Sequence, residues 1–278
     1  MLTNSFCHIQ GLGDKAEKKL WAEGIHNWDM FLSADTVNLS KAKKEKVREA
    51  LVSSQKALDN QEHSYFSQQL KSSEQWRLFK EFKDSVVYLD IETTGLDVGY
   101  SQITTCVLYD GKTINYYVNG QNMDDLIPDL KPYSVIVTYN GKCFDIPFIE
   151  GTFNVKLPHS QIDLRYVLAQ LGFKGGLKVC EKHFGLARND LEGIDGYFAV
   201  LLWKEFKRGK QSALDTLLTY NCEDVLNLEY LMHHAYNLKL KTTCFEETHT
   251  LKIPKKPESD YQADGVLVKQ LMHRFGYS

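Results

Sequence analysis

The sequence lacks the biases that mark specialised classes of protein. It has no large excess of either charge, because 33 Lys and Arg residues stand against 36 Asp and Glu residues, for a net charge of −3. Hydrophobic residues make up 43% and charged residues 25% of the 278 positions, as in ordinary globular domains. These values exclude a disordered chain, a collagen-like chain and a highly basic histone-like protein.

Cysteine pairs with metal-ligand spacing are also absent. None of the cysteines forms a C-x-x-C pair, so we expect no structural zinc site. We expect the thiols to be reduced and mostly buried, in a reducing compartment. A core of this size needs no disulfide. The six positions are Cys7, Cys106, Cys143, Cys180, Cys222 and Cys244.

Long hydrophobic runs are missing as well. No run approaches the roughly 20 apolar residues that a membrane span needs. The stretch MLTNSFCHIQGLGDK has no charged region followed by an apolar one, so it does not predict a signal peptide. The sequence therefore predicts a cytoplasmic protein without a membrane partner.

Four segments differ in their residue pattern. Residues 1–35 contain a glycine-punctuated turn, Ile9–Gly13, between predicted short helices. Residues 36–84 are predicted to be helical throughout and form a connector. Residues 85–240 predict a sheet followed by helices, which is an α/β arrangement. Residues 241–278 predict a linker and a tail.

The third segment carries the strongest patterns. Val86–Ile91 and Ser134–Tyr139 are predicted to be buried strands, and Ile103–Tyr109 and Lys112–Val118 a hairpin. From about residue 145 the chain is predicted to be mainly helical. The predicted helices there are Ile162–Leu171, Leu177–Phe184, Tyr197–Lys207 and Ser212–Lys239.

Two carboxylates end the first buried strand. Asp90 and Glu92 lie on the same face of it, because side chains alternate along a strand. Burying two acids is costly unless they are neutralised, and Mg²⁺ or Mn²⁺ prefers such oxygen ligands. For this D-x-E triplet alone, a solvated strand end is the simpler interpretation.

Two further motifs add acids. Asp145 follows the second central strand in N-x-x-x-F-D, where it can lie beside Asp90 at the carboxyl edge of the sheet or cap a helix. In the last predicted helix, Tyr220 and Asp224 share one face at i, i+4 spacing. That face is otherwise apolar, so Asp224 is expected to point inward; an ordinary Tyr–Asp pair is the alternative.

The three motifs in this order resemble the DEDD superfamily of 3′–5′ exonucleases. With a tyrosine at the first position of the last motif, the sequence resembles the DEDDy branch, such as the proofreading domain of family B DNA polymerases. The resemblance covers about residues 85–240 and implies a ribonuclease H-like fold, an α/β mixed sheet flanked by helices. The sequence is most similar to the YprB-type predicted exonucleases, through residues 89–96, 139–142, 159–165 and 176–188.

The resemblance implies roles for the motif residues. It implies two divalent metal ions, Mg²⁺ or Mn²⁺, with Asp90 bridging both. Glu92 and Asp224 would complete the site that activates water, and Asp145 would reach the second metal through waters. Tyr220 would orient the attacking water, since a phenol with a free pKa of about 10 is a poor base by itself.

Weaker predictions concern the substrate. The resemblance implies contact with the terminal nucleotide for the residues after the first acids, Thr93, Thr94 and Gly95. Asn140 holds its loop or touches substrate. Three basic residues are candidates for phosphate contacts, although a solvated surface charge is the simpler interpretation of the lysines: Lys142, Lys178 and Arg188. Asp163 is interpreted as the N-cap of the helix that starts near Leu164.

The N-terminal turn resembles a helix-hairpin-helix. In that motif the backbone N–H groups of a Gly-x-Gly turn and of the following helix bind a DNA phosphate, in a sequence-independent and salt-sensitive contact. The residues expected to bind DNA are Gly11, Gly13 and Lys15. The alternative is a small helical packing module.

The resemblance therefore implies a metal-dependent 3′–5′ exonuclease acting on DNA, in DNA repair. An exoribonuclease is an alternative that keeps the same site. A nucleic-acid-binding module without activity is another. A helicase partner fits this interpretation, because such exonucleases often need another protein to expose a strand.

Overall fold

A five-stranded mixed sheet forms the centre of the molecule. The computed structural model describes residues 1–186, 191 and 193–277. The strands lie in the order β3-β2-β1-β4-β5, with β1–β2 and β2–β3 antiparallel and β1–β4 and β4–β5 parallel. Their bounds are β1 (Val86–Thr93), β2 (Ile103–Tyr109), β3 (Ile114–Val118), β4 (Val135–Thr138) and β5 (Ser160–Asp163).

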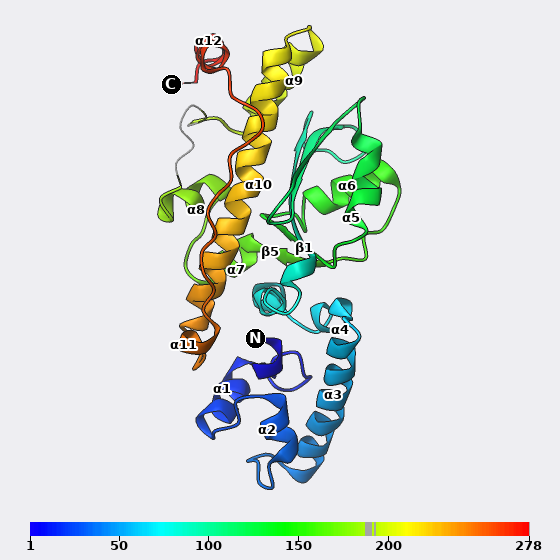
Figure 1. The fold of residues 1–278 in the computed structure, drawn as a ribbon, viewed down its shortest axis with the longest axis vertical. Coiled ribbons are helices and arrows are strands. Elements are labelled where there is room, and N and C mark those ends of the chain that lie inside the picture. The colour runs from blue at the N-terminus through cyan, green and yellow to red at the C-terminus, as the bar shows by residue number, and fades with distance from the viewer. Residues whose placement is uncertain (187–190, 192, 278) are drawn as a thin grey trace.

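Different helices cover the two faces of the sheet (Figure 1). Tyr88 and Val107 pack in one hydrophobic cluster with α10 and α7. Val87 and Leu89 pack in another, with α5 and α6. The alternation of side chains along β1 thus decides which helix each residue meets. The helices are α5 (Leu126–Leu130, after η4, Met123–Asp125), α6 (Asp145–Phe153), α7 (Leu164–Gln170) and α10 (Gln211–Leu240).

The C-terminal chain runs back along α10, as the orange-to-red segment in Figure 1 shows. The Leu251 N–H donates to Asn237 Oδ1 at 2.9 Å, and the Asp264 N–H donates to Thr216 Oγ1 at 2.9 Å. Lys256 pairs with Glu223 between these points. The remaining helices of this half are α8 (Leu177–His183), α9 (Gly196–Lys207), α11 (Glu246–His249) and α12 (Gly265–Phe275).

The N-terminal third is helical and shares a core with α10. Trp76 packs edge-on against Tyr236 of α10, with ring centroids 5.5 Å apart, and Trp21 packs against Phe245 at 5.2 Å. The elements are η1 (Leu2–Asn4), α1 (Asp14–Ala22), α2 (Trp28–Ser33), α3 (Lys41–Asp59), α4 (His63–Ser67), η2 (Ser72–Leu78) and η3 (Lys83–Ser85).

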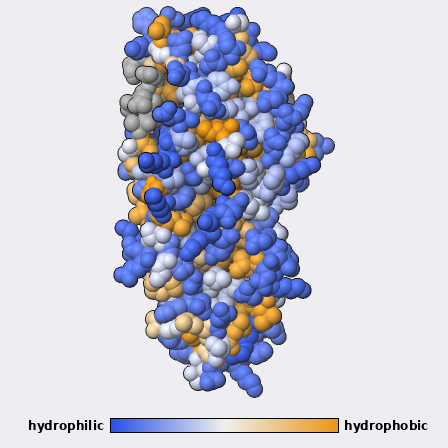
Figure 2. Space-filling view, in the orientation of Figure 1, coloured by the Kyte–Doolittle hydropathy of each residue, from blue (hydrophilic) through white to orange (hydrophobic). Residues whose placement is uncertain are grey.

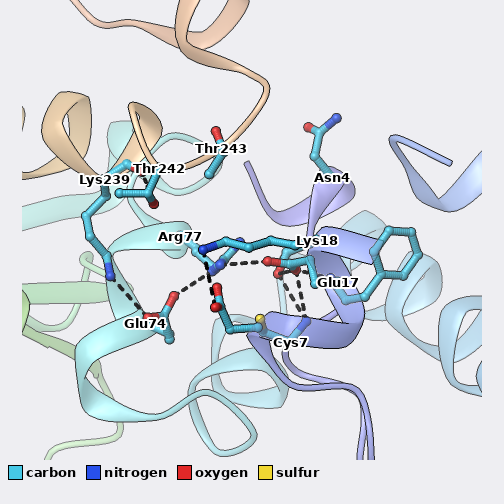
Figure 3. A network of polar contacts seen from close by, with 12 residues as sticks. Asn4, Cys7, Glu17, Lys18, Glu74, Arg77, Lys239, Thr242 and Thr243 are labelled. Atoms are coloured by element: carbon cyan, nitrogen blue, oxygen red, sulfur yellow. Dashed lines mark hydrogen bonds and ion pairs between the residues drawn. The ribbon is translucent and has the colours of Figure 1, made fainter. Parts of the chain in front are cut away.

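A buried ionic network joins the N-terminal helices to α10 (Figure 3). Arg77 of η2 donates to Glu17 of α1 at 2.8 Å and to Glu74 at 2.9 Å. Lys239 of α10 contacts the other oxygen of Glu74 at 3.1 Å. Glu17 also accepts a hydrogen bond from the Phe6 N–H at 2.6 Å. These contacts link two acids and two bases where three elements meet. We name them the ionic network.

The predicted fold class, an α/β mixed sheet flanked by helices, is confirmed. Three details were wrong. The strand β5 was not predicted, and β3 begins at Ile114 rather than Lys112. Residues 36–84 are not helical throughout, because the chain turns at Gln61, whose φ is 57°, and again before η2.

The surface agrees with the composition. The face seen in Figure 2 is mostly hydrophilic, with apolar residues in separate patches. All six cysteines, which lie in the described part of the chain, are free; Cys143 and Cys244 are exposed, Cys7 is half-buried and the other three are buried. None of the helices described here is both long and apolar enough to cross a membrane.

Candidate active site

Three carboxylates converge where β1 meets α10. Asp90 and Glu92 follow Tyr88 at alternate positions of β1, so they face α10 as Tyr88 does. Asp224 approaches from α10, and one ligand oxygen from each acid lies within 4.8 Å of the others. Glu92 and Asp224 are only 8% and 5% exposed. The predicted proximity of these acids is therefore present.

Asp145 adjoins the three. It is the first residue of α6, whose N-cap is Phe144, so the capping alternative does not hold. Its Oδ1 accepts a hydrogen bond from the Ile91 N–H at 3.2 Å, which places it between Asp90 and Glu92 along β1. The pKa of Asp145 is raised to about 7, mainly by burial; backbone hydrogen bonds act to lower it, and the charges of Asp163 and Asp224 act to raise it.

Tyr220 lies one helical turn before Asp224 on α10. Its side chain is buried, and the Lys178 amine on α8 donates to its hydroxyl at 2.7 Å. The same amine lies 4.7 Å from the centroid of the tyrosine ring. Lys178 was predicted to contact phosphate; the structure places it against Tyr220.

Asn221 is the residue that the sequence reasoning missed. Its Nδ2 donates to Asp90 Oδ2 at 2.7 Å, and its Oδ1 accepts from Thr105 Oγ1 at 3.0 Å. The side chain thus ties the first acid to α10 and β2. A signal was present, because Asn221 stands among apolar residues at helical spacing, such as Leu217 and Val225, and a buried amide needs partners.

A cavity of about 580 Å³ opens beside the acids. We name it the carboxylate cavity. Asp90, Glu92 and Asp145 line it from the sheet side, and Tyr197 and Lys204 of α9 line it from the helix side. It also includes the residues that were predicted to contact the terminal nucleotide: Thr93, Thr94 and Gly95.

The loop after β4 is held by Asp163. Asn140 has a φ of 67°, and its N–H donates to Asp163 Oδ1 at 2.8 Å. Asp163 Oδ2 accepts from the Lys142 N–H at 3.2 Å, and Oδ1 also accepts from the Arg165 N–H, as predicted for the cap of α7. Asn140 lines the carboxylate cavity.

The other basic candidates are placed differently. The Lys142 amine donates to Ser72 Oγ at 3.1 Å, and burial lowers its pKa. Lys142 is thus turned toward η2. Arg188 lies outside the described residues.

The predicted DNA-binding turn is exposed. Gly11 has a φ of 85°, which favours glycine, and Gly13 is the N-cap of α1. Nothing lies within 4 Å of a Cβ built at either glycine, and Lys15 is exposed. The Lys43 amine donates to the Gly11 carbonyl at 3.1 Å. DNA binding by this turn stays a prediction, as do the predicted domain boundaries.

Comparison with known proteins identifies the domain. A family model described as the RNase_H superfamily matches residues 87–236, more than half of the chain. The chain belongs to the RNase_H superfamily. The matched range contains the four acids and Tyr220. Membership of the RNase_H superfamily indicates a nuclease with a nucleic-acid substrate, and it agrees with the ribonuclease H-like fold that the family resemblance implied.

Solved structures and curated proteins add little to this assignment. Among the similar structures is the family B DNA polymerase from the hyperthermophilic archaeon Pyrobaculum calidifontis, with 15% sequence identity and a TM-score of 0.41. The match covers 56% of this chain and 24% of the polymerase chain. A search of curated proteins gave no match.

Proposed function

We propose that the protein is a DEDDy-type 3′–5′ exonuclease, of the YprB type, that hydrolyses phosphodiester bonds of DNA with two Mg²⁺ or Mn²⁺ ions. The convergence of Asp90, Glu92 and Asp224 within 4.8 Å, in a domain of the RNase_H superfamily, carries the proposal. Two-metal sites built from such acids suit the in-line displacement of a phosphodiester.

The donor set fits hard divalent cations. Every ligand atom in the cluster is a carboxylate oxygen, the type that Mg²⁺ and Mn²⁺ prefer. Asp90, Glu92 and Asp224 would hold the ions directly, and Asp145 would do so through water. When bound, the ions supply Lewis acidity that lowers the pKa of the attacking water and stabilises the leaving 3′-oxygen.

The neighbouring side chains orient these groups. Asn221 fixes the Asp90 carboxylate by its hydrogen bond at 2.7 Å. The Tyr220 hydroxyl accepts from Lys178, which fixes the position of its oxygen. In the proposed reaction the same hydroxyl donates its hydrogen to the attacking water and so orients it. Lys178 is then a positioning residue.

The substrate strand would enter the carboxylate cavity. Thr93, Thr94, Gly95 and Asn140 line it and are proposed to contact the terminal nucleotide. The exposed turn at Gly11, Gly13 and Lys15 is proposed to bind a phosphate of the nucleic acid. Its resemblance to a helix-hairpin-helix is the ground for proposing DNA rather than RNA. A role in DNA repair and a helicase partner belong to the same proposal.

A cleavage assay tests the proposal. The full chain is incubated with 5′-labelled single-stranded DNA, duplex DNA or RNA, in Mg²⁺, Mn²⁺ or EDTA. We expect a ladder of shortened DNA that disappears in EDTA and with Asp90→Ala. The control is Glu223→Gln. Glu223 is next to Asp224 in the sequence but pairs with Lys256, so this variant should remain active.

The same assay separates the alternatives. Shortening of RNA in preference to DNA would identify an exoribonuclease. Absence of cleavage with either metal, together with salt-dependent DNA binding, would contradict the proposal and identify a binding module.

A further inference from the structure

A second cavity lies next to the carboxylate cavity. Its volume is about 630 Å³, within the range of ligand sites. It lies between α7 and the start of α8, and we name it the arginine cavity. Among its lining residues are Tyr139, Asn140, Arg165, Phe173 and Lys174.

The two cavities share a wall. Tyr139 and Asn140 line both of them, so a strand that leaves one cavity across these residues enters the other. The wall is fixed from several sides. Asp163 holds the backbone of Asn140, and Tyr139 donates its hydroxyl hydrogen to the Gly175 carbonyl at 2.5 Å.

The arginine cavity has the groups that bind a nucleotide of a single strand. Arg165 and Lys174 are exposed cations, and a guanidinium suits phosphate oxygens in particular. Tyr139 and Phe173 are half-buried aromatic rings at the same cavity, on which a base can stack. Among the described residues that line this cavity there is no acid.

Arg165 also connects the two cavities directly. Its Nη1 donates to Asn140 Oδ1 at 2.5 Å, so one cation lies at the wall itself. Lys174 comes from the loop before α8, and its replacement leaves this bond in place. Replacing Lys174 therefore tests the positive charge of the cavity alone, whereas replacing Arg165 also removes a hydrogen bond of the shared wall.

We propose that the arginine cavity binds a second nucleotide of the substrate strand, next to the one that is cleaved. Arg165 and Lys174 bind its phosphate, and Tyr139 and Phe173 contact its base. This inference rests on the proposed nuclease function, because it assumes that the strand reaches the carboxylates. It makes the preferred substrate a single strand at least two nucleotides long.

The test compares a long ligand with a short substrate. The full-length variants Arg165→Gln and Lys174→Gln are measured beside Lys112→Gln, which removes an exposed charge in the turn between β2 and β3. Binding of a fluorescent single-stranded dodecamer is followed by anisotropy in EDTA over a range of salt. Hydrolysis of the p-nitrophenyl ester of thymidine 5′-monophosphate, which has one nucleotide, is followed in Mn²⁺.

We expect each cavity variant to weaken dodecamer binding about tenfold, as for loss of a charged hydrogen bond. The salt slope should fall by about 0.7, since one fewer phosphate is neutralised on a single strand. With Lys174→Gln, hydrolysis of the ester should stay within about twofold of wild type, because the ester is too short to reach the arginine cavity.

Three results would overturn the inference. One is dodecamer binding that the cavity variants change no more than Lys112→Gln does. Another is an equal loss for the ester and the dodecamer with Lys174→Gln, since the charge would then act at the carboxylate cavity. The third is a wild-type chain that does not bind the dodecamer. If the wild type binds DNA but cleaves nothing, the proposed function fails and the binding comparison still decides this inference.

Discussion

Two groups of buried or half-buried acids in this protein are arranged differently. In the ionic network, Glu17 and Glu74 each contact Arg77, and Glu74 also contacts Lys239. At the sheet edge, three ligand oxygens of Asp90, Glu92 and Asp224 point at one another within 4.8 Å. The first group places a base between acids, whereas the second places acids around a shared volume.

The two arrangements suit different roles, one in stability and the other in catalysis. A buried acid that meets a base holds elements together, and here the bases join α1 and η2 to α10. Acids that surround one volume repel each other, and a bound cation relieves that repulsion. The comparison therefore predicts that replacing a sheet-edge acid removes activity, and that replacing a network residue removes stability.

The largest expected effect is on catalysis. Asp90→Asn keeps the size of the side chain but removes the charge, and we expect kcat to fall at least about 10³-fold. The reason is that metal stabilisation of the transition state is worth several kcal/mol, and each 1.4 kcal/mol is tenfold in rate. Initial rates on 5′-labelled DNA measure the loss. Activity within tenfold of wild type would contradict the account, as would an equal loss in Glu223→Gln.

The next effect is on stability. Arg77→Met leaves Glu17 buried without its base, so the free energy of unfolding should drop by about 3 kcal/mol. Urea denaturation measures it. The matched control is Lys18→Met, which breaks the exposed pair with Asp14 and should cost less than about 1 kcal/mol. Similar losses of unfolding free energy in both variants would contradict a structural role for the ionic network.

Glu229, a buried acid outside both groups, extends the comparison to the effect of pH on stability. Burial raises the pKa of Glu229 to about 7, against a hydrogen bond from Tyr109 that lowers it. Because the folded-state pKa lies above the unfolded one, folding favours the protonated acid. Its contribution is full below about pH 4.5 and is lost as the pH rises to about 7, by at most about 1.4 kcal/mol per pH unit.

The measurement is urea denaturation of wild type and Glu229→Gln across this range. The stability of the wild type relative to the variant should fall between pH 4.5 and pH 7. A difference that stays constant or rises with pH would mean that Glu229 is stabilised as a charged group.

The smallest effect concerns DNA binding by residues 1–35, which the ionic network joins to the rest of the protein through Glu17. Lys15→Gln should lower the salt slope of duplex DNA binding by about 0.9, since one phosphate contact is lost. Cleavage of a short single strand should not change. Lys131→Gln, an exposed lysine after α5, is the control. An unchanged slope would favour the interpretation of residues 1–35 as a packing module.

Local rules were enough to place the acids. Alternation along a strand put Asp90 and Glu92 on one face, i, i+4 spacing turned Asp224 inward, and parallel strands brought Asp145 to the same edge. Each of these rules acts over a few residues or over one strand pair. The structure brings these four side chains together accordingly.

The missed features depend on contacts between distant parts of the chain. The strand β5 has only four residues and forms through its register with β4, in which Ser160 pairs with Val135. Asn221 binds Asp90 across 131 positions, and Lys178 reaches Tyr220 across 42. A residue pattern shows that a buried amide or a lysine is present, but its partner is decided by the packing of α8 and α10.

Binding of Mn²⁺ tests the central claim most directly, because it needs no substrate. Calorimetric titration of the full chain should show two ions per molecule at neutral pH. Asp224→Asn should lose at least one ion or weaken binding at least about tenfold, while Glu223→Gln should match wild type. Absence of binding at millimolar Mn²⁺, or equal binding in Asp224→Asn, would contradict the assignment of the sheet-edge acids as a metal centre.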